Sequence, residues 1–195
     1  MKVTLLRITQ DPEELIASSA RICYASEPKA QDADKKLIRN LRDWGHFSAF
    51  EHSSATFQVE GVSRACTHQL VRHRIASYNQ QSQRYVNEKG FEYVTPATVE
   101  KDPKAKKKYD QTVEAVRKAY EELIALGIPK EDARFLLPNA CATKIVLTMN
   151  FRELRHFIKL RGAKDAQWEI RQLAHEMLAI LKEKAPNVFD DLMPS

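Results

Sequence analysis

Fourteen consecutive residues, from Arg72 to Tyr85, offer almost nothing from which a hydrophobic core could be built. The stretch holds three arginines, one histidine, two serines and four side-chain amides, and it has no acidic residue. Planar guanidinium groups without a neutralising carboxylate are suited to binding phosphate or another anion. We therefore expect the chain to fold around this stretch and to expose it at a ligand-binding surface.

The rest of the chain indicates a single domain, residues 1–195, of mixed α/β class with a central sheet flanked by helices. A chain of 195 residues can bury a substantial core, and its five glycines and lack of internal repeats disfavour solenoids and flexible two-domain arrangements. Strand patterns cover residues 3–8 and 55–59, and residues 142–149 resemble a buried strand. Helical patterns cover about residues 33–44, 63–73, 109–126, 150–161 and 166–184, with a short turn after 129.

Two helix starts have recognisable capping signals. Asp11, Pro12 and two acidic residues announce a helix after residue 11, and Asn150 with Glu153 forms a capping-box pattern. Residues 46–52 are expected to form a loop. The lysines between residues 101 and 108 precede the predicted helix at 109 and are interpreted as a solvated face.

Charge and cysteine usage give weaker indications. The formal net charge of +5 favours anionic ligands without choosing among them. The three cysteines are widely spaced and form no CxxC pair, so neither a disulfide framework nor a zinc knuckle is indicated. No run approaches eighteen apolar residues, and no secretory signal is evident at the beginning. We expect a soluble, cytoplasmic protein.

The arginine-rich stretch has the form RHRxxSxNxxSxRY, with eight fixed positions. This pattern resembles the signature of the flavin-dependent thymidylate synthases, and so many fixed positions make a chance match improbable. The resemblance continues at residues 45–52, which are similar to the family's upstream loop, and at 150–161 with 166–171, which are similar to its C-terminal block.

The resemblance implies an enzyme that methylates dUMP to dTMP with methylenetetrahydrofolate, using FAD that NADPH reduces. It also implies a homotetramer in which each active site is assembled from several chains. The residues that would contact FAD are Ser48, Arg72, His73, Arg74, Gln80, Asn150, Arg152 and His156. Those that would contact dUMP are Gln69, Arg72, Gln80, Ser82, Gln83, Arg84, Arg134 and Arg161. Family members commonly have glutamate where this chain has Gln80, so a carboxylate contact there does not carry over.

Two residues are assigned to the chemistry. A guanidinium at Arg161 beside the pyrimidine imide would stabilise its deprotonated, more nucleophilic form. Ser82 is interpreted as orienting the pyrimidine, because the sequence shows no base to activate its hydroxyl. Two of these residues also have a purely structural interpretation: Asn150 as a helix N-cap and Arg161 as a partner of its helix terminus.

Other classes of function remain as alternatives. A nucleic-acid-binding module would use the arginines as phosphate contacts and Tyr78 and Tyr85 as stacking platforms, but no RNP, KH or helix-turn-helix pattern is present. A flavoprotein that binds nucleotide without methylating it is a nearer alternative. No metal site is expected, because the histidines belong to no HExxH or Cys/His set.

Overall fold

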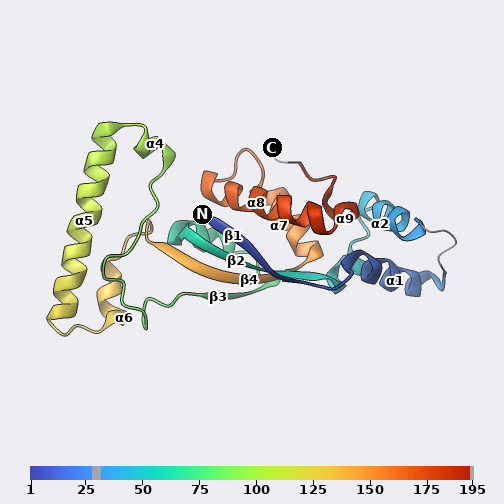
Figure 1. Cartoon of the computed structure of the whole chain (residues 1–195), viewed down its shortest axis with the longest axis horizontal. Helices are drawn as coiled ribbons and strands as arrows, with labels where there is room; N and C mark the ends of the chain where they lie inside the picture. Colours follow the sequence, from blue (N-terminus) through green and yellow to red (C-terminus); the bar gives the residue numbers. More distant parts are fainter. Residues whose placement is uncertain (28–31, 194–195) are drawn as a thin grey trace. The chain divides into compact units, whose positions relative to one another are not determined.

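The computed structural model describes residues 1–27 and 32–193 (Figure 1). Its elements, in chain order, are β1 (Lys2–Ile8), α1 (Pro12–Tyr24), α2 (Ala33–Asp43), the 3-10 helix η1 (Ser48–His52), β2 (Ser54–Ser63), α3 (Arg64–Leu70), β3 (Ala76–Gln80), α4 (Ala97–Glu100), α5 (Pro103–Ala125), α6 (Lys130–Ala133), the 3-10 helix η2 (Arg134–Leu136), β4 (Ala142–Asn150), α7 (Phe151–Arg161), α8 (Trp168–Lys184) and α9 (Pro186–Phe189). Within these residues, no helix combines the length and hydrophobicity needed to cross a membrane.

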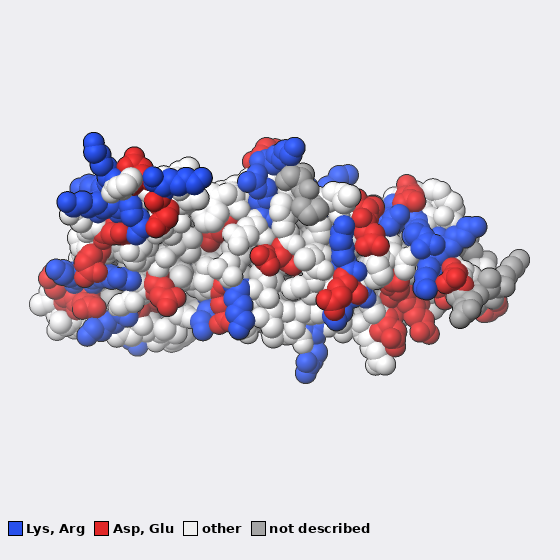
Figure 2. All heavy atoms as spheres, turned by 45° about the horizontal axis from the view of Figure 1, so that its top comes forward, with Lys and Arg blue, Asp and Glu red and all other residues white. Residues whose placement is uncertain are grey.

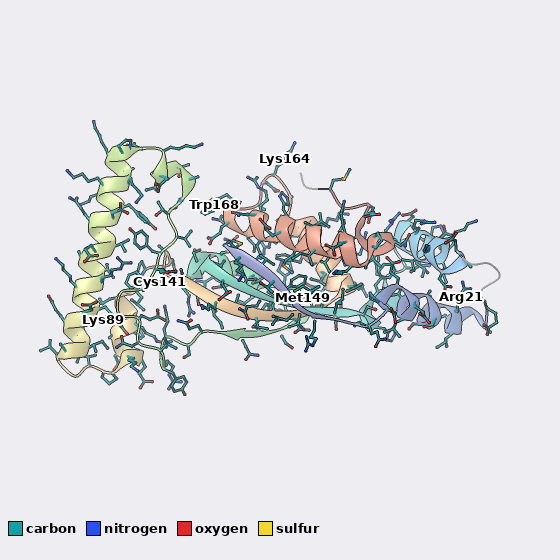
Figure 3. All side chains as sticks on the ribbon, in the orientation of Figure 1. Arg21, Lys89, Cys141, Met149, Lys164 and Trp168 are labelled. Atoms are coloured by element: carbon teal, nitrogen blue, oxygen red, sulfur yellow. The ribbon has the colours of Figure 1, made fainter. Side chains whose placement is uncertain are left out.

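The four strands form an antiparallel sheet in the order β1-β2-β4-β3, flanked by helices, so the predicted mixed α/β class is confirmed. Side chains of β2 and β4 alternate between buried and less buried positions, as the period of two in a strand requires. Phe57, Leu147 and Met149 are fully buried, and Figure 3 labels Met149 near the end of β4. The prediction of a buried strand at 142–149 is thus correct for one face only.

The chain divides into two compact units, and each strand contributes residues to both. The first comprises Met1–Lys2, Val59–His68 and Asn79–Ile145, and the second comprises Val3–Gln58, Gln69–Tyr78 and Val146–Ser195. The expectation of a single domain remains a prediction.

In the second unit, α1 packs against α2 and η1, and α8 packs against α7 and α9. The apolar stripe predicted for the last long helix is buried: Ile170, Leu173, Met177 and Leu181 all lie in the core. Figure 1 shows α7 and α8 beside the strand segments that belong to the second unit. These two helices carry most of the C-terminal block that the sequence singled out.

In the first unit, α5 packs against α4, α6 and η2. A small core of Phe91, Val113 and Cys141 lies beneath it. Helix α5 begins at Pro103, six residues before the predicted start at 109, because the Asp102 side chain caps it. The lysines are therefore mainly on the first turns of the helix. Figure 2 shows this positively charged surface interspersed with acidic side chains, as expected for a solvated face.

Several local predictions differ from the structure. Asp11 precedes α1 as predicted, but its φ of 42° places it in the left-handed region and its side chain makes no capping bond. Residues 48–52 form η1 rather than an irregular loop. Helix α3 ends at Leu70, not 73, so Arg72 lies beyond the helix that was expected to carry it together with Gln69.

The first unit also buries a carboxyl group. The side chain of Glu88 accepts a hydrogen bond from Nε2 of Gln81 at 3.4 Å, and the residue is 7% exposed. Burial raises the pKa of Glu88, and this effect exceeds the opposing influence of Gln81 and the Arg64 guanidinium. Burial likewise raises the pKa of the Cys141 thiol to about 12, which makes this cysteine a poor nucleophile.

We predict that the N-cap of α5 contributes measurably to stability. Oδ1 of Asp102 accepts hydrogen bonds from the backbone N–H groups of Lys104 at 2.8 Å and Ala105 at 3.2 Å. Asp102→Ala should lower the free energy of unfolding by about 1 kcal/mol, measured by urea denaturation. Asp102→Asn is the matched control, because its side-chain oxygen can still cap the helix. Equal losses in both variants would contradict this role.

We also predict that Glu88→Gln stabilises the protein at neutral pH. Because the folded state raises the Glu88 pKa, protonation of this carboxyl group favours folding. This contribution to stability is complete below the unfolded pKa and is lost as the pH rises through the folded pKa. An amide avoids this loss, since it has no charge to desolvate. Denaturation at a series of pH values should show a smaller decline between acidic and neutral pH for the variant. A steeper decline would show that the Arg64 pairing outweighs desolvation.

Candidate functional site

The arginine-histidine-arginine segment lies between α3 and β3, where its side chains alternate in exposure. Arg72 and Arg74 are exposed, whereas His73 is 4% exposed. The hydroxyl of Tyr78 lies 2.9 Å from the carbonyl of Leu70 and 2.8 Å from that of His73, so its single proton is shared between the two carbonyls and holds the backbone of the segment. The prediction that this stretch contributes nothing to the core was therefore wrong for His73, which anchors the segment.

Nδ1 of His73 lies 2.8 Å from Oε1 of Glu153 in the first turn of α7, and the Glu153 residue is also buried. On the other side of the ring, Nε of Arg161 donates to Nε2 of His73 at 3.2 Å. Burial lowers the pKa of His73, Glu153 opposes this shift, and the positive charge of Arg161 adds to it. The imidazole is accordingly held neutral between a carboxylate and a guanidinium.

Asn150 is the N-cap of α7, as predicted, and its Oδ1 accepts from the backbone N–H of Glu153 at 2.9 Å. The predicted capping box is confirmed for Asn150 but wrong for Glu153, because the Glu153 carboxylate is hydrogen-bonded to His73. Glu153 was missed as a site residue for this reason. Its capping pattern explained it locally, and no sequence signal identified a distant histidine as its partner.

A cavity of about 550 Å³ opens beside this cluster in the second unit. Among the residues that line it are Asn150, Arg152 and His156, three of the predicted flavin contacts. Lys159 adds a positive charge, while Phe47 and Ile75 supply apolar surface. Glu51 and Glu153 also line the cavity, but its basic and apolar residues together suit a ligand that combines an anionic group with a flat ring.

The other predicted flavin contacts of this unit are not all gathered at the cavity. Ser48 is exposed at the beginning of η1, and Arg72 and Arg74 make no side-chain hydrogen bond with the described part of the chain. Arg152 forms an ion pair with Glu51, so its guanidinium is already oriented on the cavity wall. The structure thus gathers Asn150, Arg152 and His156 of the C-terminal block at the cavity, whereas Arg72 and Arg74 of the signature are exposed.

His73, Glu153 and His156 place ligand atoms within 4.8 Å of one another, a separation that a metal ion could bridge. Both ring nitrogens of His73 are already hydrogen-bonded, one of them to a cationic side chain. A second cation at this point would be repelled by Arg161. We therefore interpret the group as a hydrogen-bonded cluster.

A second group of predicted residues lies in the first unit. Nη2 of Arg84 lies 2.9 Å from Oε2 of Glu131, and Nε of Arg134 donates to the Glu131 carbonyl at 3.1 Å. These contacts bring two guanidinium groups to one short segment. Oγ of Ser82 accepts from the backbone N–H of Arg84 at 3.2 Å, and no base is hydrogen-bonded to this hydroxyl in the described structure. The contact favours a positioning role for Ser82.

Gln80 is half-buried at the end of β3, where Nε2 donates to Oγ1 of Thr67 at 3.0 Å and lies 3.5 Å from Oγ1 of Thr143. The amide is thus tied to its neighbours. No hydrogen bond or ion pair ties the side chains of Gln69 and Gln83 to the rest of the described chain, and both residues are half-buried.

Comparisons with known proteins identify the family of the chain. The family model described as thymidylate synthase complementing protein matches residues 4–187. A flavin-dependent thymidylate synthase of Geobacter sulfurreducens is 49% identical over all of this chain and 88% of its own length. Enzymes of the same name from Clostridium tetani and Pyrococcus furiosus are each 44% identical over the whole chain, which spans 88% and 82% of their lengths. The chain therefore belongs to the family of the flavin-dependent thymidylate synthases.

Proposed function

We propose that this protein converts dUMP to dTMP in the cytoplasm, with 5,10-methylenetetrahydrofolate as the one-carbon donor and FAD reduced by NADPH. The observation that carries the proposal is the cluster in the second unit. There the signature histidine His73 contacts Glu153 and Arg161 of the C-terminal block, beside the cavity lined by Arg152 and His156. Residues from the arginine-rich signature and from the C-terminal block thereby meet at one site.

The cavity residues fit a flavin dinucleotide. Arg152 and Lys159 can neutralise a pyrophosphate, Asn150 offers a side-chain amide, and Phe47 and Ile75 can pack on a ring system. Ser48, Arg72, His73, Arg74, Gln80 and His156 complete the proposed flavin contacts. When bound, reduced FAD supplies the electrons that convert the transferred one-carbon unit into a methyl group.

The nucleotide substrate is assigned to the residues that the family resemblance gives to dUMP. Arg84 and Arg134 both contact Glu131 within the first unit and offer guanidinium groups for the dUMP phosphate. Arg72 is carried over to dUMP from the resemblance alone. Ser82 and Gln83 orient the pyrimidine in this proposal, with Gln69 and Gln80 as further polar contacts. Ser82 needs no nucleophilic role, because the folate supplies the carbon and the flavin supplies the electrons.

Arg161 is the proposed catalytic residue. A guanidinium next to the pyrimidine imide stabilises its deprotonated form, which raises the electron density at the ring carbon that accepts the methyl group. Arg161 is half-exposed, and the described structure records no hydrogen-bond partner for its Nη groups. Those groups are therefore available for a substrate.

We infer that the working enzyme is a homotetramer with FAD at subunit interfaces. Arg72 and Arg74 support this inference, because they are exposed on their own subunit without a side-chain hydrogen bond to its described part. A ligand shared between subunits would give both guanidinium groups an anionic partner.

The first test is flavin binding. Purified protein titrated with FAD should bind the flavin tightly and keep its absorbance after unbound FAD is removed. Arg152→Gln should weaken the affinity about tenfold or more, because it removes a charge-assisted hydrogen bond. Arg171→Gln is the matched control, since Arg171 donates to the carbonyl of Lys164 and does not line the cavity. Protein that refuses FAD would refute the proposal, and protein that binds FAD and dUMP but forms no dTMP would instead be a nucleotide-binding flavoprotein.

The second test is Arg161→Lys. Lysine keeps the positive charge near the end of α7 but loses the planar group, so turnover should fall about a hundredfold while the melting temperature stays nearly constant. The measurement is dTMP formation at saturating dUMP and FAD. Near-normal turnover would remove Arg161 from the chemistry. A lower melting temperature with proportionate loss of FAD would assign it to the helix terminus.

A further inference from the structure

The hydrogen bonds around His73 determine which of its nitrogens carries the proton. An arginine Nε–H can only donate, so Nε2 of His73 must accept the 3.2 Å bond from Arg161 and cannot be protonated. The single proton of the neutral ring is then on Nδ1, where it is donated to Oε1 of Glu153 at 2.8 Å. Any protonation of Nε2 would break the bond to Arg161.

The ring has little freedom to leave this position. Phe157 packs against it edge-on at 5.1 Å between ring centroids, and the backbone carbonyl of His73 accepts from the hydroxyl of Tyr78 at 2.8 Å. Both His73 and Glu153 are less than 10% exposed. The carboxylate itself lies in the first turn of α7, where the helix dipole favours negative charge.

Arg161 is in the last turn of the same helix, eight positions after Glu153. His73 therefore connects the two ends of α7 through one rigid ring. Because the bond to His73 uses Nε, it fixes the plane of the guanidinium while leaving the two Nη groups for another partner. A flexible arginine would otherwise spend much of its time in unproductive rotamers.

We propose that His73 is a positioning residue for Arg161: held by Glu153 as the neutral Nδ1–H tautomer, it accepts from Arg161 Nε and aims the guanidinium at the substrate. This inference deepens the proposed function and rests on it. It gives His73 a role beyond the flavin contact that the family resemblance implies, and it assigns a role to Glu153, which that resemblance did not include.

The proposal has a consequence for pH dependence. Protonated His73 would lose its acceptor and place a second cation against Arg161. In the described part of the chain, the charged and titratable groups that act on the ring are Glu153, Arg161 and His156, while the Tyr78 hydroxyl contacts only the backbone carbonyl of His73. Burial lowers the pKa of His73 while Glu153 raises it, so removing the Glu153 charge should lower it further. Turnover should therefore decline as the pH falls through this pKa, and the decline should move to lower pH in Glu153→Gln.

Two substitutions of His73 separate its two hydrogen bonds. In His73→Gln the side-chain oxygen can replace the Nε2 acceptor, whereas in His73→Asn the amide can replace only the Nδ1 donor. At saturating FAD and dUMP, we expect kcat to fall about tenfold to a hundredfold in His73→Asn and clearly less in His73→Gln. Equal losses, or the opposite order, would overturn the proposal, because a purely structural histidine needs mainly its bond to the buried carboxylate.

The pH profile supplies a second readout. The acidic limb of kcat should shift to lower pH in Glu153→Gln and stay in place in His175→Gln. His175 is a suitable control because it is another half-buried histidine, whose Nε2 contacts the Gly162 carbonyl at 3.0 Å, immediately after α7. An unshifted limb in Glu153→Gln would count against the proposal.

The third measurement does not depend on turnover. Nitrogen NMR of the full-length protein labelled with ¹⁵N-histidine, in the absence of ligands, should show His73 as the neutral Nδ1–H tautomer at neutral pH, with His73→Gln identifying the signal. The Nε2–H tautomer or a charged ring would refute the proposal even if the enzyme forms dTMP. If the tautomer is as expected but no dTMP forms, the proposed function fails instead.

Discussion

The buried hydrogen bond between Glu153 and His73 is the constraint on which the rest of the second unit depends. A carboxylate and an imidazole are costly to bury separately, and each satisfies the other at 2.8 Å. Because Glu153 belongs to the first turn of α7 and His73 to the segment before β3, the bond joins two parts of the chain that are eighty residues apart. Arg161 then extends the same network to the far end of α7.

This anchoring explains how one polar segment can serve both stability and binding. In the arginine-histidine-arginine segment, which turns away from the end of α3, the middle side chain is buried in the core and its neighbours are exposed. The buried histidine fixes the direction of both arginines without using their hydrogen-bonding capacity. Arg72 and Arg74 are thus held ready for the anion contacts that we propose, and such preorganisation lowers the conformational cost of binding.

The sequence predicted most of this fold because hydrophobic periodicity records burial directly. The alternation in β2 and the stripe of Ile170, Leu173 and Met177 in α8 are where it placed them. What it could not predict depends on partners distant in sequence. The sequence pattern identified Glu153 only as a capping residue, whereas the fold places its carboxylate against His73. The cap at Asp102 starts α5 before the apolar stripe by which the helix was predicted. Likewise, the sequence placed Arg72 within the helix that ends at Leu70, because helix ends are weakly encoded. The resemblance supplied the site residues, but only the fold could show which of them meet.

The same reasoning applies to Gln80, where the chain departs from the common family residue. The Thr67 hydroxyl donates its only proton to the carbonyl of Arg64 at 3.0 Å, so it can serve Gln80 only as an acceptor. An amide meets this need through Nε2, whereas a carboxylate would place one acceptor against another. The hydroxyl would then have to give up the Arg64 carbonyl to donate to a glutamate. The surroundings of position 80 are therefore matched to a neutral donor, and the stretch from Arg72 to Tyr85 keeps the positive charge with which we propose it binds anions.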